Sequence, residues 1–139
     1  MKRLLLISIL IKSMMIPMAC TSGSNTSANA GQVASSGTWR VTLFTDSGTD
    51  QTANFSGYVF TFSSAGTVTA VKGSITKNGT WSVNSSSNKF NIDLGAKGST
   101  NQPMGDLTND WQIISASNTE IKLKNDNSTS NEFLTLTKN

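Results

Sequence analysis

Apolar and polar side chains alternate along most of the chain beyond residue 36. Successive side chains of a β-strand point to opposite faces of the sheet, so this two-residue period predicts strands with one buried face. The Val, Ile, Thr and aromatic residues of these runs also favour strands. The predicted inward positions are Trp39, Val41, Leu43, Tyr58, Phe60, Phe62, Val68, Ala70, Trp81, Val83, Phe90, Ile92, Leu94, Trp111, Ile113, Ile121, Leu123, Leu134 and Leu136.

Segments rich in Gly, Asn and Ser separate these runs, and these residues are typical of turns. Residues 63–66 predict a tight hairpin turn, with Gly66 in the backbone conformation of positive φ. Residues 73–79 and 84–88 are predicted to be further turn regions. Residues 45–56 are predicted to be a polar loop.

The longest break between predicted strands, residues 95–109, contains Pro103, Met104 and Leu107. We expect these three residues to pack over one end of the fold in a short helical turn. No segment shows the helical period. Eight short strands with frequent turns predict an all-β, eight-stranded antiparallel up-and-down barrel, because closure removes the unpaired edges of a sheet. A two-sheet sandwich is the alternative that periodicity leaves open.

The first residues of the chain have a different pattern. Lys2 and Arg3 precede an apolar run over residues 4–11, and the small residue Ala19 follows at the expected cleavage point. This arrangement predicts a signal peptide over residues 1–19. The apolar run is too short to span a bilayer as a helix.

The formal net charge of +3 comes from the same segment. Three of the eleven Lys and Arg residues are Lys2, Arg3 and Lys12, and the other eight balance the eight Asp and Glu residues. A surface that binds phosphates requires clustered Lys and Arg side chains. The charge distribution therefore argues against nucleic acid as a partner.

Cys20, the only cysteine, ends the tetrapeptide Pro-Met-Ala-Cys, which resembles the lipobox of bacterial lipoproteins. The resemblance implies cleavage before Cys20 and acylation of this residue, and two or more acyl chains make a stable membrane anchor. Residues 20–36, rich in Ser, Thr, Asn, Gly and Ala, are predicted to be a flexible tether. Thr21 and the lack of an early acidic run imply, by the same resemblance, an outer-membrane lipoprotein that faces the periplasm.

Short motifs within residues 37–139 resemble those of bacterial lipocalin-like lipoproteins of the calycin group. The motifs are Gly37-Thr38-Trp39, Phe62 to Thr67, Gly79 to Trp81, Asp110-Trp111 and Leu134 to Lys138. The resemblance implies a lipocalin-like barrel domain in which Gly37 and Trp39 close the bottom. It also implies that a basic side chain from a late strand packs on this indole, and Lys124 and Lys138 are the candidates.

Large aromatic residues on the predicted inward faces are the candidate binding residues. An eight-stranded barrel has an interior that side chains just fill or that holds one small ligand. One hypothesis is therefore a lipid-anchored module that binds a small apolar ligand. The alternatives are an envelope interaction protein with a filled barrel that acts through its loops, and a sandwich that binds glycans on a surface tryptophan. The candidate ligand-binding residues are Tyr58, Phe60, Phe62, Trp81, Phe90 and Trp111.

Side chains suited to catalysis are sparse. The chain has no histidine, the commonest general base and metal ligand near neutral pH, and Cys20 is expected to be acylated. Asp46 and Asp50 lie in one predicted loop, but this loop lacks the ligand series of an EF-hand. We therefore expect no enzyme activity, no cofactor and no metal site. The expected partners are a membrane, a small apolar ligand or an envelope protein.

Overall fold

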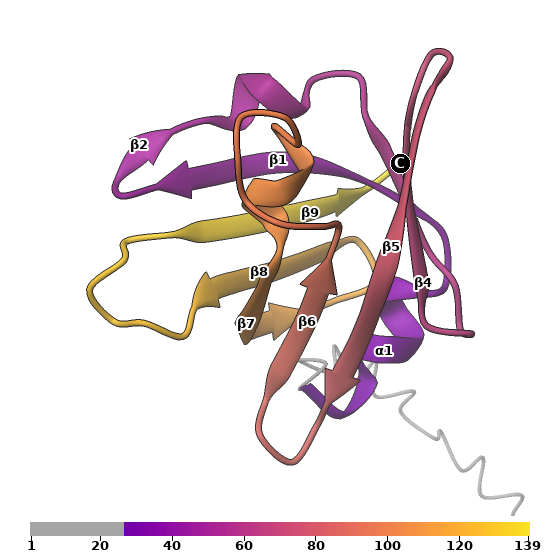
Figure 1. Cartoon of the computed structure of the whole chain (residues 1–139). Coiled ribbons are helices and arrows are strands. Elements are labelled where there is room, and N and C mark those ends of the chain that lie inside the picture. Colours follow the sequence, from indigo (N-terminus) through magenta and orange to yellow (C-terminus); the bar gives the residue numbers. More distant parts are fainter. Residues whose placement is uncertain (1–26) are drawn as a thin grey trace, which may run out of the picture.

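The computed structural model describes residues 27–139. The predicted signal peptide and Cys20 lie outside the described residues. Nine strands form one antiparallel sheet in the order β2-β1-β3-β4-β5-β6-β7-β8-β9, and β9 also pairs with β1 (Figure 1). The strands are β1 (Thr38–Asp46), β2 (Thr49–Asp50), β3 (Val59–Phe62), β4 (Thr67–Lys72), β5 (Ile75–Asn84), β6 (Lys89–Asp93), β7 (Asn109–Ala116), β8 (Glu120–Asn125) and β9 (Phe133–Lys138).

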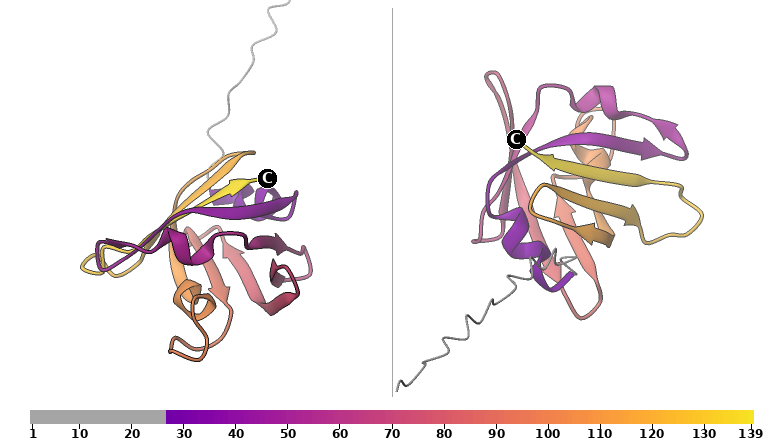
Figure 2. Two further views of the ribbon diagram at one scale, coloured as in Figure 1. Left: turned by 90° about the horizontal axis from the view of Figure 1, so that it is seen from above. Right: turned by 180° about the vertical axis from the view of Figure 1, so that it is seen from behind.

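The pairing of β9 with β1 closes a barrel of eight strands, which confirms the predicted fold class. The strand β2 is a two-residue addition that pairs with the end of β1. Gly66 has a φ of 86° in the turn between β3 and β4, as predicted. The two views of Figure 2 show the closed wall of the barrel from above and from behind.

The hairpin of β4 and β5 is longer than the sequence suggested. The predicted turn over residues 73–79 is wrong, because β5 begins at Ile75 and only Gly73 and Ser74 connect the two strands. Pairing starts directly beside this turn, between Lys72 and Ile75. The φ of 57° at Gly73 is the left-handed conformation that a two-residue hairpin turn requires. The hairpin therefore projects past the barrel at the top of Figure 1.

One inward position was assigned to the wrong residue. Leu43 is 38% exposed, whereas Val41 and Phe44 are buried. The register of β1 against β9 shifts between Val41 and Leu43. Such a bulge adds one residue to a strand and so reverses the faces of the residues that follow. A second shift in β7, after Ile113, brings Ala116 inside in the same way.

Helix α1 (Ser27–Ala34) occupies part of the segment predicted to be a tether, residues 20–36. The tether prediction is therefore wrong for the helical residues, in which no helical period had been recognised. Ala30, Val33 and Ala34 are buried at the i, i+3, i+4 spacing of one helix face. An isolated helix of this length is marginal in water, so packing against β5 and β7 stabilises it.

Two 3-10 helices cover other parts of the barrel. The predicted polar loop, residues 45–56, contains β2 and the helix η1 (Thr52–Phe55), and Phe55 is buried against the core. The helix η2 (Met104–Leu107) confirms the expected short helical turn, with Met104 and Leu107 buried. None of the helices in the described part of the chain is long and apolar enough to cross a bilayer.

Candidate functional site

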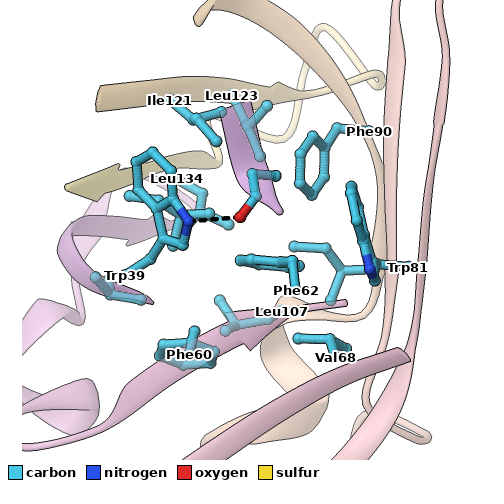
Figure 3. Packing of buried hydrophobic residues seen from close by; sticks show 14 of the residues in the cluster. Trp39, Phe60, Phe62, Val68, Trp81, Phe90, Leu107, Ile121, Leu123 and Leu134 are labelled. Atoms are coloured by element: carbon cyan, nitrogen blue, oxygen red, sulfur yellow. Dashed lines mark hydrogen bonds between the residues drawn. The ribbon is translucent and has the colours of Figure 1, made fainter. Parts of the chain in front are cut away.

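All six aromatic residues proposed as ligand contacts lie in the core of the barrel. Three of them form one cluster around Phe62 (Figure 3). The ring of Phe62 meets Trp81 edge-on at 5.2 Å and Phe90 edge-on at 5.5 Å, and Trp81 stacks on Phe90 at 5.4 Å between centroids. Each such aromatic pair contributes about 0.5–1.5 kcal/mol beyond its area burial. These three rings therefore pack against one another.

A second aromatic cluster contains two residues that the sequence analysis did not propose. Phe44 meets Phe55 at 5.1 Å and Trp111 at 6.4 Å between ring centroids, both edge-on. Phe44 was not among the predicted inward positions, because the bulge in β1 brings it inside in place of Leu43, and Phe55 lies in a segment predicted to be polar. The remaining two proposed ligand contacts are Tyr58 and Phe60. Their ring centroids are 6.4 Å apart, and both residues are buried.

Each of the three tryptophans donates its indole N–H to a backbone carbonyl that lies outside the strands of the barrel. Trp39 bonds to Ala34 at the end of α1, at 2.8 Å, and the dashed line in Figure 3 marks this bond. Trp81 bonds to Ser63 in the β3–β4 turn at 2.8 Å, and Trp111 bonds to Leu107 in η2 at 3.0 Å. Buried indole groups normally find such partners. The polar groups of all three tryptophans are therefore already satisfied within the protein.

Trp39 also has the basic neighbour that the family resemblance implied. The Nζ atom of Lys138 lies 5.8 Å from the centre of the Trp39 ring and donates to the Ser36 hydroxyl at 2.9 Å. The distance is within the range of a cation–π contact. Lys138, rather than the exposed Lys124, is thus the partner of Trp39. Gly37 lies beside the stem of Lys138, where a Cβ atom would overlap that flexible side chain.

A hollow of about 570 Å³ lies at the surface of the molecule, between α1 and β5. Trp81 and Val83 line it from β5, Gly31 from α1, Ser35 from just after α1, and Ala65 from the β3–β4 turn. None of its lining residues is charged. This hollow could hold a small uncharged molecule, whereas the predicted site inside the barrel is occupied by side chains.

A second hollow, of about 540 Å³, lies over β5, β6 and β7 and is more polar. Asp93 and Asp110 lie on its border, with Asn91 between them. The Asn91 amide donates to the Ser82 hydroxyl at 3.3 Å, while its Oδ1 atom has no hydrogen-bond partner among the described residues. Within residues 27–139, no three potential metal ligands come together.

The acidic side chains of the barrel have structural partners. Glu132 is buried and accepts hydrogen bonds from Asn125, from Asn109 at 3.3 Å and from Lys97 at 3.4 Å. Burial raises the pKa of the Asp106 carboxyl above its usual value, although the positive charge of Lys97 opposes this shift and nearby carboxylates add to it. The hydrogen bonds of Glu132 connect the loop before η2, β7 and β8 to the residue that precedes β9.

Exposed aspartates serve in turns. The Asp50 carboxylate accepts a hydrogen bond of 2.8 Å from the backbone N–H of Thr52, and bonds to this residue lower the pKa of Asp50. Asp93 accepts from the N–H of Gly95 at 2.9 Å in the same manner. Such local bonds are what Asp contributes to turns generally, so they indicate no reaction chemistry.

Comparison with known proteins supports the fold alone. No family model matches the sequence, and no curated protein does. A solved structure of a DUF4847-family protein from Bacteroides vulgatus is similar, with a TM-score of 0.57 and 19% identity, and the match covers 78% of this chain and 96% of that one. The NMR structure of a protein from Burkholderia xenovorans is similar with a TM-score of 0.50 and 15% identity, and it covers 96% and 99% of the two chains.

Proposed function

We propose that the protein is a non-catalytic, lipid-anchored binding module of the bacterial cell envelope that binds its partner on the outer surface of the barrel. The observation that carries this proposal is the filled interior. The six aromatic residues proposed as ligand contacts are 9% exposed or less and pack on core residues. A ligand inside the barrel would have to displace rings whose removal each costs about 3–5 kcal/mol.

The acyl anchor on Cys20 is part of the proposal. Since α1 begins at Ser27, seven residue steps separate it from Cys20. Even a fully extended chain of that length reaches only about 25 Å. An acylated Cys20 would therefore hold the α1 end of the barrel close to the lipid surface and leave the opposite end, with the β4–β5 turn, to face outward (Figures 1 and 2).

A second candidate function is the capture of a small uncharged ligand in the hollow between α1 and β5. The observation that favours it is the lining, which combines the edge of Trp81 with Val83 and small hydroxyl-bearing residues and contains no charge. Its volume of about 570 Å³ is in the range of small-molecule sites. This candidate retains the predicted apolar ligand but places it outside the barrel.

Titration with an apolar fluorescent dye separates these possibilities. We expect the full chain carrying Cys20→Ala to show no saturable binding of N-phenylnaphthylamine, because the barrel holds no space for it. The matched variant is Gly31→Leu, whose side chain would extend toward Val83 and fill the outer hollow. Saturable binding that Gly31→Leu abolishes would favour the second candidate. Saturable binding that this variant leaves unchanged would place the dye inside the barrel and refute the filled-barrel proposal.

Membrane fractionation tests the anchor. The wild-type protein should remain with the membrane pellet after alkaline wash and incorporate labelled palmitate, whereas Cys20→Ala should do neither. Thr21→Ala, next to the cysteine, is the control and should behave as the wild type. Membrane retention of Cys20→Ala at the wild-type level would contradict acylation at this residue.

A further inference from the structure

The strand β5 has an unpaired edge over half of its length. It pairs with β4 from Ile75 to Thr80, but β6 pairs with it only from Thr80 to Asn84. Within the described residues, no strand lies beside Ile75 to Gly79 on the β6 side. The strand β6 ends at Asp93, and the residue that follows, Leu94, is buried in the core.

The direction of the backbone groups along β5 follows from one hydrogen bond. The Trp81 N–H donates to the Gly66 carbonyl at 2.9 Å, on the β4 side of the strand. Backbone groups of successive strand residues point alternately to the two sides. The N–H and C=O groups of Thr76 and Asn78 therefore point to the unpaired edge. These groups are the donors and acceptors that an added strand would use.

Both charged side chains of the β4–β5 hairpin are positive, and the carboxylate residue Asp93 pairs with Thr80, next to the end of this edge. No Asp or Glu occurs between Gln51 and Ile92, whereas Lys72 and Lys77 lie on the hairpin. Lys77 pairs across from the buried residue Ala70 and is half-buried on the inner face. No carboxylate of the described residues forms an ion pair with Lys77, since the salt bridges there involve other lysines.

The same lysine argues against pairing between two copies of this chain. An antiparallel pair that used the whole edge, Ile75 to Gly79, would be centred on Lys77 and would place the two Lys77 side chains directly opposite. Like charges directly opposite each other across a strand pair are destabilising. A carboxylate at that position would instead be stabilising. Ile75, 56% exposed, lies two residues away on the same face and would contact an apolar side chain of the added strand.

We infer that the unpaired edge of β5 binds an extended acidic protein segment, which adds to the sheet as a strand beyond the end of β6. The segment carries a carboxylate opposite Lys77 and an apolar residue two positions away, opposite Ile75. This inference rests on the proposed function, since it names the part of the surface that binds. The edge lies at the end of the barrel remote from α1, and so remote from the proposed anchor (Figure 1).

Peptide titration followed by ¹H–¹⁵N NMR tests the inference on the full chain carrying Cys20→Ala. The probe is the capped peptide Thr-Val-Thr-Asp-Thr-Val-Thr, and its matched control has Lys in place of Asp. We expect the acidic peptide to shift the amide signals of Thr76 and Asn78 most. The lysine peptide should bind about five-fold more weakly or worse, as the energies of cross-strand charge pairs indicate.

Two variants of β5 locate the contact. Thr76→Pro removes a donor from the unpaired edge without removing one from the β4 pairing, and it should abolish binding, whereas Thr76→Val keeps the donor and should bind as the parent protein does. Lys77→Glu should reverse the preference between the two peptides, and this test holds even if the proline variant fails to fold.

Equal binding of both peptides, signal shifts away from β5, or an unchanged preference in Lys77→Glu would overturn the assignment of this edge. So would dimerisation of the chain through β5 in sedimentation experiments. These outcomes leave the filled-barrel proposal intact, because that proposal depends on dye exclusion. Saturable dye binding inside the barrel would refute the proposed function whatever the peptides do.

Discussion

The two halves of β5 belong to one continuous strand but have very different surroundings. From Thr80 to Asn84 the strand pairs with β6, and on its other side Thr80 pairs with β4 and the Trp81 N–H bonds to Gly66 of the β3–β4 turn. Trp81 is buried against Phe62 and Phe90. From Ile75 to Gly79 the strand has a neighbour on one side only, and its residues are exposed or half-buried. Burial alternates along the strand, but residues 75–79 alternate only between exposed and half-buried, whereas Trp81 in the other half is buried. Burial in this protein therefore depends on which other segments reach the strand.

The comparison also separates two uses of polar groups. In the closed half, the Trp81 indole is bonded to the Ser63 carbonyl, and the backbone is paired with β6 along its whole length. In the open half, the backbone N–H and C=O groups of Thr76 and Asn78 point to a side on which no strand of the described residues lies. Natural edge strands commonly carry lysine as protection against unwanted pairing. Lys77 is consistent with this role and, in our inference, also selects an acidic partner.

Replacement of the core residue in the closed half should have the largest effect on stability. Trp81→Ala removes a buried indole that packs on two rings, and we expect the free energy of unfolding to fall by about 3–5 kcal/mol. Trp81→Phe keeps a ring but loses the hydrogen bond to Ser63, so a smaller loss is expected. Chemical denaturation measures both. A loss below about 1 kcal/mol for Trp81→Ala would show that the closed half is not packed as described.

The junction between the two halves should tolerate only glycine. A Cβ atom on Gly79 would overlap the backbone carbonyl of Asp93, which cannot move without shifting β6. Gly79→Ala should therefore lower the free energy of unfolding by about 1–3 kcal/mol. The control is Gly31→Ala in α1, where a Cβ would make an ordinary contact of 3.8 Å with Val83 and should stabilise the protein by up to about 1 kcal/mol. Equal effects of both substitutions would contradict these packing differences.

A negative charge on Asp106, in the helix η2 that covers one end of the barrel, should destabilise the folded protein. Burial raises the pKa of Asp106 above its ordinary value of 3.8, so the folded protein holds this proton more tightly than the unfolded chain does. The stability that the protonated Asp106 carboxyl contributes is then fully present below pH 3.8 and is lost as the pH rises through the pKa of Asp106 in the folded protein. Asp106→Asn should gain stability relative to the wild type over that interval. Unfolding curves across roughly pH 3 to 7 measure this, and a constant difference would contradict it.

The smallest effect is expected in the open half of β5. Ile75→Thr replaces a side chain that is 56% exposed by another residue suited to strands, and stability should change by no more than about 0.5 kcal/mol. In the peptide titration, the same variant should weaken binding of the valine-containing probe. A large loss of stability would indicate that Ile75 packs on the barrel, and the contrast between the two halves would then disappear.

Much of the fold was predictable from the alternation of residues. Phe60 and Phe62 are inward because their strand is regular, and so are Phe90 and Ile92. Errors occurred where the alternation is interrupted. A bulge in β1 exchanged the faces of the residues after Val41, and nothing in the local pattern marks its position. The helix α1 was missed because it has only three buried residues, and contact with the end of the barrel is what buries them.

The candidate site was predictable in its residues but not in its role. The aromatic positions were identified correctly as inward, yet inward residues can line a cavity or fill it. Phe44 and Phe55, which complete the second cluster, come from the segments that the pattern assigned incorrectly. The unpaired edge of β5 was likewise missed, because residues 73–79 were predicted to be a turn.

By itself, the sequence determined the class of the fold, the approximate strands and the residues that face inward, because alternation is a property of each strand alone. Only the tertiary structure decided that the interior is solid, that Lys138 is the basic partner of Trp39 and that half of β5 has a free edge. These features depend on volumes and pairings summed over segments far apart in the chain. A local pattern cannot contain them.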